Sequence, residues 1–234
     1  MQPHIHDAVF ALRPDFHALS LTVDSDGVAS PQGAEIAARV LAEGCAVATA
    51  GGPDWAASHL EAWREAFRGF GAKPQRTACS ADALRARVLR DGTLPSLGLV
   101  VDLYNGLSLK YAAPFGGEDA DAYAGAPRLI RARGDEAFDT MKDGVAATEA
   151  PEPGEVVWRD DLGVTCRRWN WRQGVRTRLG PGAKRMWFII EALGPMPPAA
   201  LTAAGEELGG LMGEVFPGAR VETTRLGADV GADG

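Results

Sequence analysis

The sequence of 234 residues has little cysteine, little histidine and no long apolar run. Its three cysteines, Cys45, Cys79 and Cys166, lie far apart and form no C-x-x-C, which argues against a disulfide framework or a zinc ribbon. The longest apolar runs, such as residues 187–190, are too short to span a bilayer. Residues 1–15 show neither the basic start nor the apolar stretch of a signal peptide. We therefore expect a soluble, cytoplasmic protein with no membrane partner.

Positive charge is also in short supply. Lysine and arginine number 24 against 31 acidic residues, which gives a net charge of −7. A generic nucleic-acid binder needs a positive field, so DNA is not an expected partner, and any RNA contact must come from a local basic patch. No P-loop, G-x-S-x-G, H-E-x-x-H or G-x-G-x-x-G motif occurs. We expect no cofactor and no metal, and interpret His4 and His6 as a polar turn in preference to a metal site.

Apolar periodicity divides the chain into a helical first half and a strand-rich second half. The predicted helices cover 33–43, 60–70, a segment beginning at Ser80, 96–111 and 197–215. The predicted strands cover 17–23, 129–132, 155–158, 164–171, 186–193 and 220–225. These elements predict one α/β domain over residues 1–226, with helices packed around a largely antiparallel central sheet. Residues 227–234 are expected to form a flexible tail. The oligomeric state is open, and a monomer is compatible with the sequence.

Polar groups gather between residues 100 and 121. Asp102 and Asn105 lie three residues apart and are expected to share one face of a helix. Pro114 is expected to end that helix, and Gly116 and Gly117 would let the backbone approach a ligand closely. Backbone N–H groups freed there could hold a carboxylate, a phosphate or an oxyanion. The alternative is an ordinary helix end followed by a solvated acidic loop.

Basic side chains gather between residues 162 and 190, a segment without a single acid. Strand alternation over 164–171 would place Trp169 and Trp171 on one face and Arg168, Asn170 and Arg172 on the other. Arginine forks match phosphate oxygens, and aromatic rings can stack on bases. The alternative is a solvated strand whose charges pair with acids elsewhere. The seven basic residues are Arg167, Arg168, Arg172, Arg176, Arg178, Lys184 and Arg185.

Together these two segments resemble a known family. Residues 94–119 spell LPSLGLVVDLYNGLSLKYAAPFGGED, residues 166–173 spell CRRWNWRQ, and residues 188–191 spell FIIE. The combination is similar to the tRNA-editing (B3/B4) domain of the phenylalanyl-tRNA synthetase β subunit, and more closely to free-standing proteins built from that domain alone. The resemblance implies a compact α/β fold around a central sheet. It also implies a metal-independent deacylase, acting in trans, whose partner is the 3′ acceptor end of an aminoacylated tRNA.

The resemblance carries over only in part. Asp102, Asn105 and Pro114 match the V-D-x-x-N and the later proline of the β subunit. The histidine that follows this proline in the β subunit aligns with Gly116. Its editing glutamate falls in a segment that here spells QGVRT, residues 173–177, without an acid. The tyrosine specificity of the synthetase domain and its acid or base therefore do not transfer to this chain.

The resemblance and the residue chemistry together assign candidate roles. The backbone of Gly116 and Gly117 would hold the oxyanion or ester carbonyl, and Asn105 and Asn170 would orient water or substrate. Glu118 or Asp119 would bind the free amino group of the substrate. Further pocket and substrate residues would be Asp102, Pro114, Gln173 and Thr177. The tRNA acceptor end would contact Arg167, Arg168, Arg172, Arg176 and Arg178.

Two other functions stay open beside the deacylase. The domain could bind tRNA or a free amino acid without turnover, which the replaced histidine and glutamate favour. It could also hydrolyse a small aminoacyl or peptidyl ester unrelated to tRNA, which the net charge of −7 favours.

Overall fold

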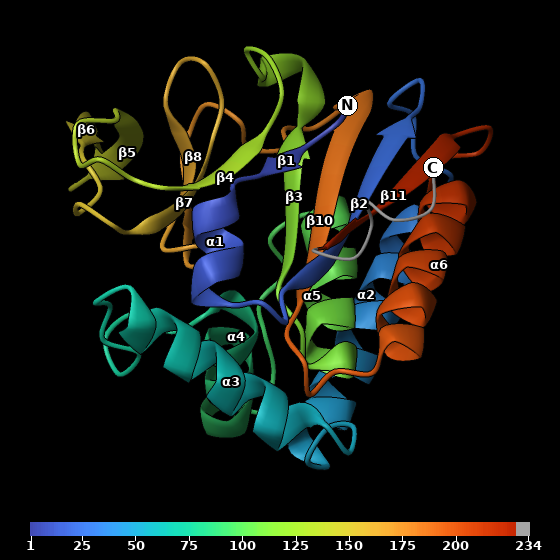
Figure 1. Cartoon of the computed structure of the whole chain (residues 1–234). Helices are drawn as coiled ribbons and strands as arrows, with labels where there is room; N and C mark the ends of the chain where they lie inside the picture. The colour runs from blue at the N-terminus through green and yellow to red at the C-terminus, as the bar shows by residue number, and fades with distance from the viewer. Residues whose placement is uncertain (228–234) are drawn as a thin grey trace, which may run out of the picture.

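Two β-sheets stand side by side in the computed structural model, which describes residues 1–227 (Figure 1). The four-stranded sheet is antiparallel throughout, in the order β11-β2-β10-β3. Its strands are β2 (His17–Asp24), β3 (Phe115–Asp119), β10 (Arg185–Ala192) and β11 (Arg220–Gly227). The larger sheet runs β1-β4-β7-β8-β5-β6, with the short β9 (Arg172–Gln173) paired to β8. Its other strands are β1 (His4–Ile5), β4 (Arg128–Arg131), β5 (Phe138–Lys142), β6 (Val145–Glu149), β7 (Val156–Arg159) and β8 (Val164–Arg167).

Three helices cover one face of the four-stranded sheet (Figure 1): α2 (Gly33–Thr49), α5 (Leu99–Tyr111) and α6 (Pro198–Val215). Helices α2 and α5 approach each other unusually closely because glycines meet at their contact. A Cβ atom added to Gly44 would lie 2.2 Å from the carbonyl oxygen of Gly106, so neither position admits a side chain. The remaining helices are α1 (Asp7–Leu12), α3 (Ala56–Gly69), α4 (Ser80–Asp91) and the short 3₁₀ helix η1 (Ala120–Ala122).

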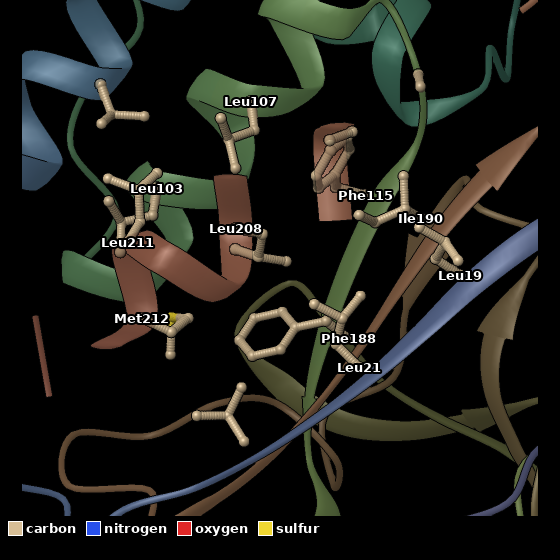
Figure 2. Packing of buried hydrophobic residues seen from close by; sticks show 14 of the residues in the cluster. Leu19, Leu21, Leu103, Leu107, Phe115, Phe188, Ile190, Leu208, Leu211 and Met212 are labelled. Atoms are coloured by element: carbon tan, nitrogen blue, oxygen red, sulfur yellow. The ribbon is translucent and has the colours of Figure 1, made fainter. Parts of the chain in front are cut away.

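Strand β10 is buried on both faces, which explains its unbroken apolar sequence. Phe188 and Ile190 point into the core shared with α5 and α6, where they meet Leu107 and Leu208 (Figure 2). The alternate residues, such as Trp187, point into a second core built with α3 and the larger sheet. The four-stranded sheet is thus the layer between two cores, and its second face is where the candidate site lies.

Most predicted elements are confirmed, including the α/β class and the largely antiparallel pairing. The single central sheet is wrong, because the strands divide between two sheets. The alternative of a solvated loop after the helix is wrong at Gly116 and Gly117, since both residues belong to β3 and pair with β10. Helix α5 begins at Leu99 instead of residue 96. The hairpin of β5 and β6, and helix α1, were not anticipated.

The predicted strand over 164–171 is confirmed over its first half, Val164–Arg167, and wrong beyond it. Strand β8 ends at Arg167, and Arg168 and Trp169 adopt left-handed conformations with φ values of 47° and 66°. The backbone therefore turns, and Trp169 becomes fully buried. Trp171 does not share a face with Trp169; the Arg168 guanidinium carbon lies 4.6 Å from the centroid of its ring.

The expected C-terminal tail lies outside the described residues, apart from Gly227, which ends β11. Within residues 1–227, no helix is long and apolar enough to cross a bilayer.

Candidate functional site

A pocket of about 330 Å³ opens on the second face of the four-stranded sheet. Its floor comes from β3 and β10, and one wall comes from the turn that joins β8 to β9. Helices α4 and α5 close the opposite side. Aromatic rings dominate the lining, which includes Tyr104, Phe115, Trp158, Trp169, Trp171 and Trp187. A mostly apolar cavity with a few polar groups is the usual form of a small-molecule site.

Glu118 is the first of two buried carboxyl groups in this pocket. It lies on β3 opposite Trp187, and alternation turns its side chain toward the pocket face of the sheet. Its Oε1 accepts hydrogen bonds from Gln173 Nε2 and Thr177 Oγ1, each at 3.1 Å. Burial raises the pKa of Glu118 from 4.5 to about 7, and the two hydrogen bonds offset part of that rise.

Glu191 on β10 is the second buried carboxyl group. Trp158 Nε1 donates to its Oε1 and Asn170 Nδ2 donates to its Oε2, both at 2.9 Å. Burial raises the pKa of Glu191 to about 7, again against its hydrogen bonds. Two buried carboxyl groups with raised pKa values in one pocket mark it as a candidate functional site, because binding and catalytic sites often hold such groups.

The register of β3 directs the backbone groups of Gly116 and Gly117 to opposite edges of the strand. The Glu191 N–H donates to the Pro114 carbonyl at 3.0 Å, so Gly116 directs its own N–H and carbonyl toward β10. Gly117 then directs both groups away from β10, and its carbonyl accepts from Gln173 Nε2 at 3.0 Å. We find no hydrogen bond from the Gly117 N–H to any described residue. Of the two predicted oxyanion donors, Gly116 is engaged with β10, whereas the Gly117 N–H lies at the outer edge of β3, next to the bridge between Glu118 and Arg178.

Asn105 and Asp102 differ in what their side chains do, although both lie on α5. Asn105 lines the pocket, and its amide makes no hydrogen bond to another residue within 1–227. Asp102 accepts from the Ser96 hydroxyl and from the Leu97 N–H, which ties the chain before α5 to its first turn. The two side chains therefore do not hydrogen-bond to each other in the described structure, and Asp102 stabilises the start of the helix.

The arginines of the basic segment are largely engaged with protein groups. Arg167 is buried and donates to Glu155 at 2.8 and 3.0 Å. Arg176 pairs with Asp160 at 2.8 Å, and Arg178 donates to the Gly174 carbonyl at 3.0 Å. Arg172 lines the pocket and contacts Glu149 and Thr140. The predicted alternative, in which these charges pair with acids elsewhere, therefore describes Arg167 and Arg176. It also holds, at longer distances, for Arg168 with Glu155 at 3.7 Å and Arg172 with Glu149 at 3.6 Å.

The B3/4 domain profile matches residues 62–200, which is more than half of the chain. This protein belongs to the B3/4 domain family. Among solved structures, the chain is similar to an N-terminal fragment of the phenylalanyl-tRNA synthetase β subunit from Pyrococcus horikoshii, with a TM-score of 0.50 and 9% sequence identity. The likeness covers 94% of this chain and 50% of that fragment, so this chain spans about half its length and shares its fold. No curated protein matches the sequence.

The fold of this B3/4 domain brings together most of the residues predicted from sequence. Those that line the pocket are Asn105, Gly116, Gly117, Glu118, Asn170, Arg172 and Gln173. Thr177 lies behind them and reaches the site through its hydrogen bond to Glu118. Asp119 turns to the other side of β3 and accepts from the Asp121 N–H at the start of η1. Pro114, whose carbonyl pairs with β10, does not line the pocket.

Sequence reasoning noted Glu191 only as part of a motif and assigned it no role. A signal was nevertheless present, because Glu191 is the single charged residue in the apolar run 186–193. Gln173 and Thr177 both donate to Glu118, so a carboxyl group reaches that part of the B3/4 pocket from β3. Within residues 1–227, no cluster of three or more His, Cys, Asp or Glu could hold a metal ion.

Proposed function

We propose that this B3/4 domain protein hydrolyses the ester bond of a mischarged aminoacyl-tRNA, acting in trans. The observation that carries the proposal is the pocket itself: a cavity in this fold that joins an aromatic lining and two buried carboxyl groups. The resemblance of the chain to editing domains supports the same reaction. A volume of about 330 Å³ accommodates an amino acid ester, while the rest of a tRNA would lie outside.

The reaction needs only modest assistance, because an aminoacyl ester is already activated. Water attacks the carbonyl carbon, negative charge develops on the carbonyl oxygen, and the bond to the ribose oxygen breaks. The free Gly117 N–H would donate to that oxygen, a contribution worth about 3–4 kcal/mol in known cases. Asn105, whose amide has no other partner in the described structure, would orient the water or the ester. Correct placement of the two reactants contributes about 7–11 kcal/mol.

The test is a deacylation panel. tRNAs charged with correct and with incorrect amino acids are incubated with the protein, and the loss of ester is followed against spontaneous hydrolysis. We expect at least one mischarged species to be hydrolysed faster by the wild type, and more slowly by Asn105→Ala. A folded protein that accelerates the hydrolysis of none of them would overturn the proposal.

A second candidate is hydrolysis of a small aminoacyl or peptidyl ester without tRNA. The engagement of Arg167 and Arg176 in internal ion pairs favours it, because these cations are not free for phosphate. The two functions differ in their response to salt. Turnover of aminoacyl-tRNA should fall as salt rises, since phosphate contacts release counterions, whereas turnover of a minimal aminoacyl-adenosine should not. Equal rates on both substrates at every salt concentration would favour the small-ester hydrolase.

A further inference from the structure

Four buried polar atoms of the pocket lining have no partner among the described residues: the acceptors Glu118 Oε2 and Asn170 Oδ1, the donor Trp169 Nε1, and the Ser80 hydroxyl, which can do either. A buried acceptor without a donor is costly, so native proteins rarely keep one without a reason. Here two occur in one cavity, on residues from different strands and turns. Glu118 Oε2 and Asn170 Oδ1 each require a donor, and Trp169 Nε1 requires an acceptor, so the missing group must carry hydrogen atoms and, beside them, one acceptor such as a carbonyl oxygen.

The orientation of each acceptor is fixed by its neighbours. Gln173 and Thr177 both donate to Glu118 Oε1, which leaves Oε2 as the free oxygen of the carboxyl group. Glu191 accepts from Asn170 Nδ2, so the amide of Asn170 must present its oxygen on the opposite side. Glu191 therefore acts as a positioning residue for Asn170. An amide held in this way offers an acceptor to the ligand and withholds its donor.

The surroundings favour a cation over a neutral donor. Four tryptophans line the cavity, and the faces of aromatic rings attract ammonium groups. Among the described lining residues, Arg172 alone is cationic, and its guanidinium is occupied by Glu149 and Thr140. A protonated amine can donate three hydrogen bonds from one atom and would satisfy both free acceptors.

We propose that the pocket selects a substrate with a free, protonated primary amine, which Glu118 Oε2 and Asn170 Oδ1 hold together. An ester whose amino group is acylated would be rejected, because it lacks the charge and two of the donors. The ammonium belongs either to the α-amino group of an aminoacyl ester or to a basic side chain. The inference rests on the proposed function only in treating this pocket as the substrate site.

Binding of small probes tests the proposal without any catalytic step. Four of the six tryptophans line the pocket, so their fluorescence reports occupancy. The probes are phenylalaninamide, which has an α-amine, Nα-acetyl-lysinamide, which has only a side-chain amine, and N-acetyl-phenylalaninamide, which has neither. We expect one of the amines to bind at least tenfold more tightly than N-acetyl-phenylalaninamide, and the tighter of the two identifies the source of the ammonium. Equal binding of all three, or binding of none, would overturn the proposal.

A pair of variants locates the ammonium site. Glu118→Gln should weaken binding of the preferred amine at least tenfold and leave N-acetyl-phenylalaninamide unchanged. Asp121→Asn removes the same charge at an exposed residue of η1 and should preserve the preference. An unchanged preference in folded Glu118→Gln would refute the assignment. If that variant does not fold, the probe series on the wild type still decides the question.

Hydrolysis and selection can fail separately. A protein that cleaves a mischarged aminoacyl-tRNA carrying the preferred amine, and the same ester with that amine acetylated, at equal rates retains the proposed function and contradicts amine selection. A protein that binds the amine probes selectively and cleaves no ester supports amine selection and contradicts the deacylase.

Discussion

Replacing Glu191 by glutamine should change how the stability of the protein depends on pH. Burial raises the pKa of Glu191 from 4.5 in the unfolded chain to about 7 in the native state. Because the pKa of Glu191 is higher in the folded state, its protonation contributes to the stability of the fold. That contribution is fully present below pH 4.5 and is lost as the pH rises through 7. The change corresponds to about 3 kcal/mol, at about 1.4 kcal/mol per pH unit. A glutamine does not titrate, so Glu191→Gln lacks this loss.

The assay is urea unfolding of wild type and Glu191→Gln at several pH values between about 5 and 8.5. The variant loses one hydrogen bond, since its amide N–H₂ must face either the Trp158 or the Asn170 donor. That loss is the same at every pH and costs about 1–2 kcal/mol. In addition to this constant difference, the unfolding free energy of the wild type should fall by about 3 kcal/mol relative to that of the variant as the pH rises across the range.

Other titrating groups cancel in this comparison. Glu118, with its pKa of about 7, and His59, whose pKa burial lowers to about 4, are present in both proteins. Glu35→Gln, on the exposed side of α2, controls for the change in net charge. The reasoning is refuted if the unfolding free energies of wild type and Glu191→Gln differ by an amount that stays constant with pH within about 0.5 kcal/mol. Replacement of an ordinary exposed carboxyl group would give such a constant difference.

Four further variants separate site from scaffold. Asn105→Ala should reduce turnover at least tenfold while unfolding changes by less than about 1 kcal/mol, since its amide bonds no described residue. Gly117→Val should lower the melting temperature, because an added Cβ would lie 2.8 Å from Phe188. Gly116→Ala should fill the pocket and reduce turnover in a folded protein, because its Cβ would lie 3.3 Å from Ile189 Cγ2, a tight contact that a small shift of that side chain relieves. The double variant Arg168→Gln with Arg172→Gln should raise KM for aminoacyl-tRNA and leave the hydrolysis of aminoacyl-adenosine unchanged. It should also flatten the plot of log affinity for tRNA against log salt concentration, whose slope we expect to be roughly −2 in the wild type. Unchanged kinetics would exclude these arginines from tRNA binding.

The sequence was sufficient for the elements whose patterns are strong. The apolar stripe of α3 and the buried run of β10 were predicted because their periodicities are long. The turn at Arg168 and Trp169 was not predictable, because nothing local requires left-handed conformations in an arginine and a tryptophan. Their geometry follows from burying Trp169 between α3 and both sheets, which is a tertiary effect.

The candidate site was likewise predictable only in part. Asn105, Glu118 and Asn170 could be named from their motifs, but their relation to one another depends on sheet register. That Gly117 and not Gly116 offers its N–H follows from a single backbone pairing between β3 and β10. The engagement of Arg167 with Glu155 was likewise invisible, since the partners lie on β8 and in the loop before β7.

The strand order β11-β2-β10-β3 sets a sequence of events for folding. Strand β2 is made early in synthesis, yet both of its neighbours, β10 and β11, are made after residue 184. Its apolar residues must wait for most of the chain to leave the ribosome before they can be covered. Such distant pairing is slow, because loop closure precedes the contacts that reward it. The pocket floor, which needs β10 beside β3, cannot exist in a nascent chain shorter than about 190 residues, so the site is completed only after translation of most of the domain.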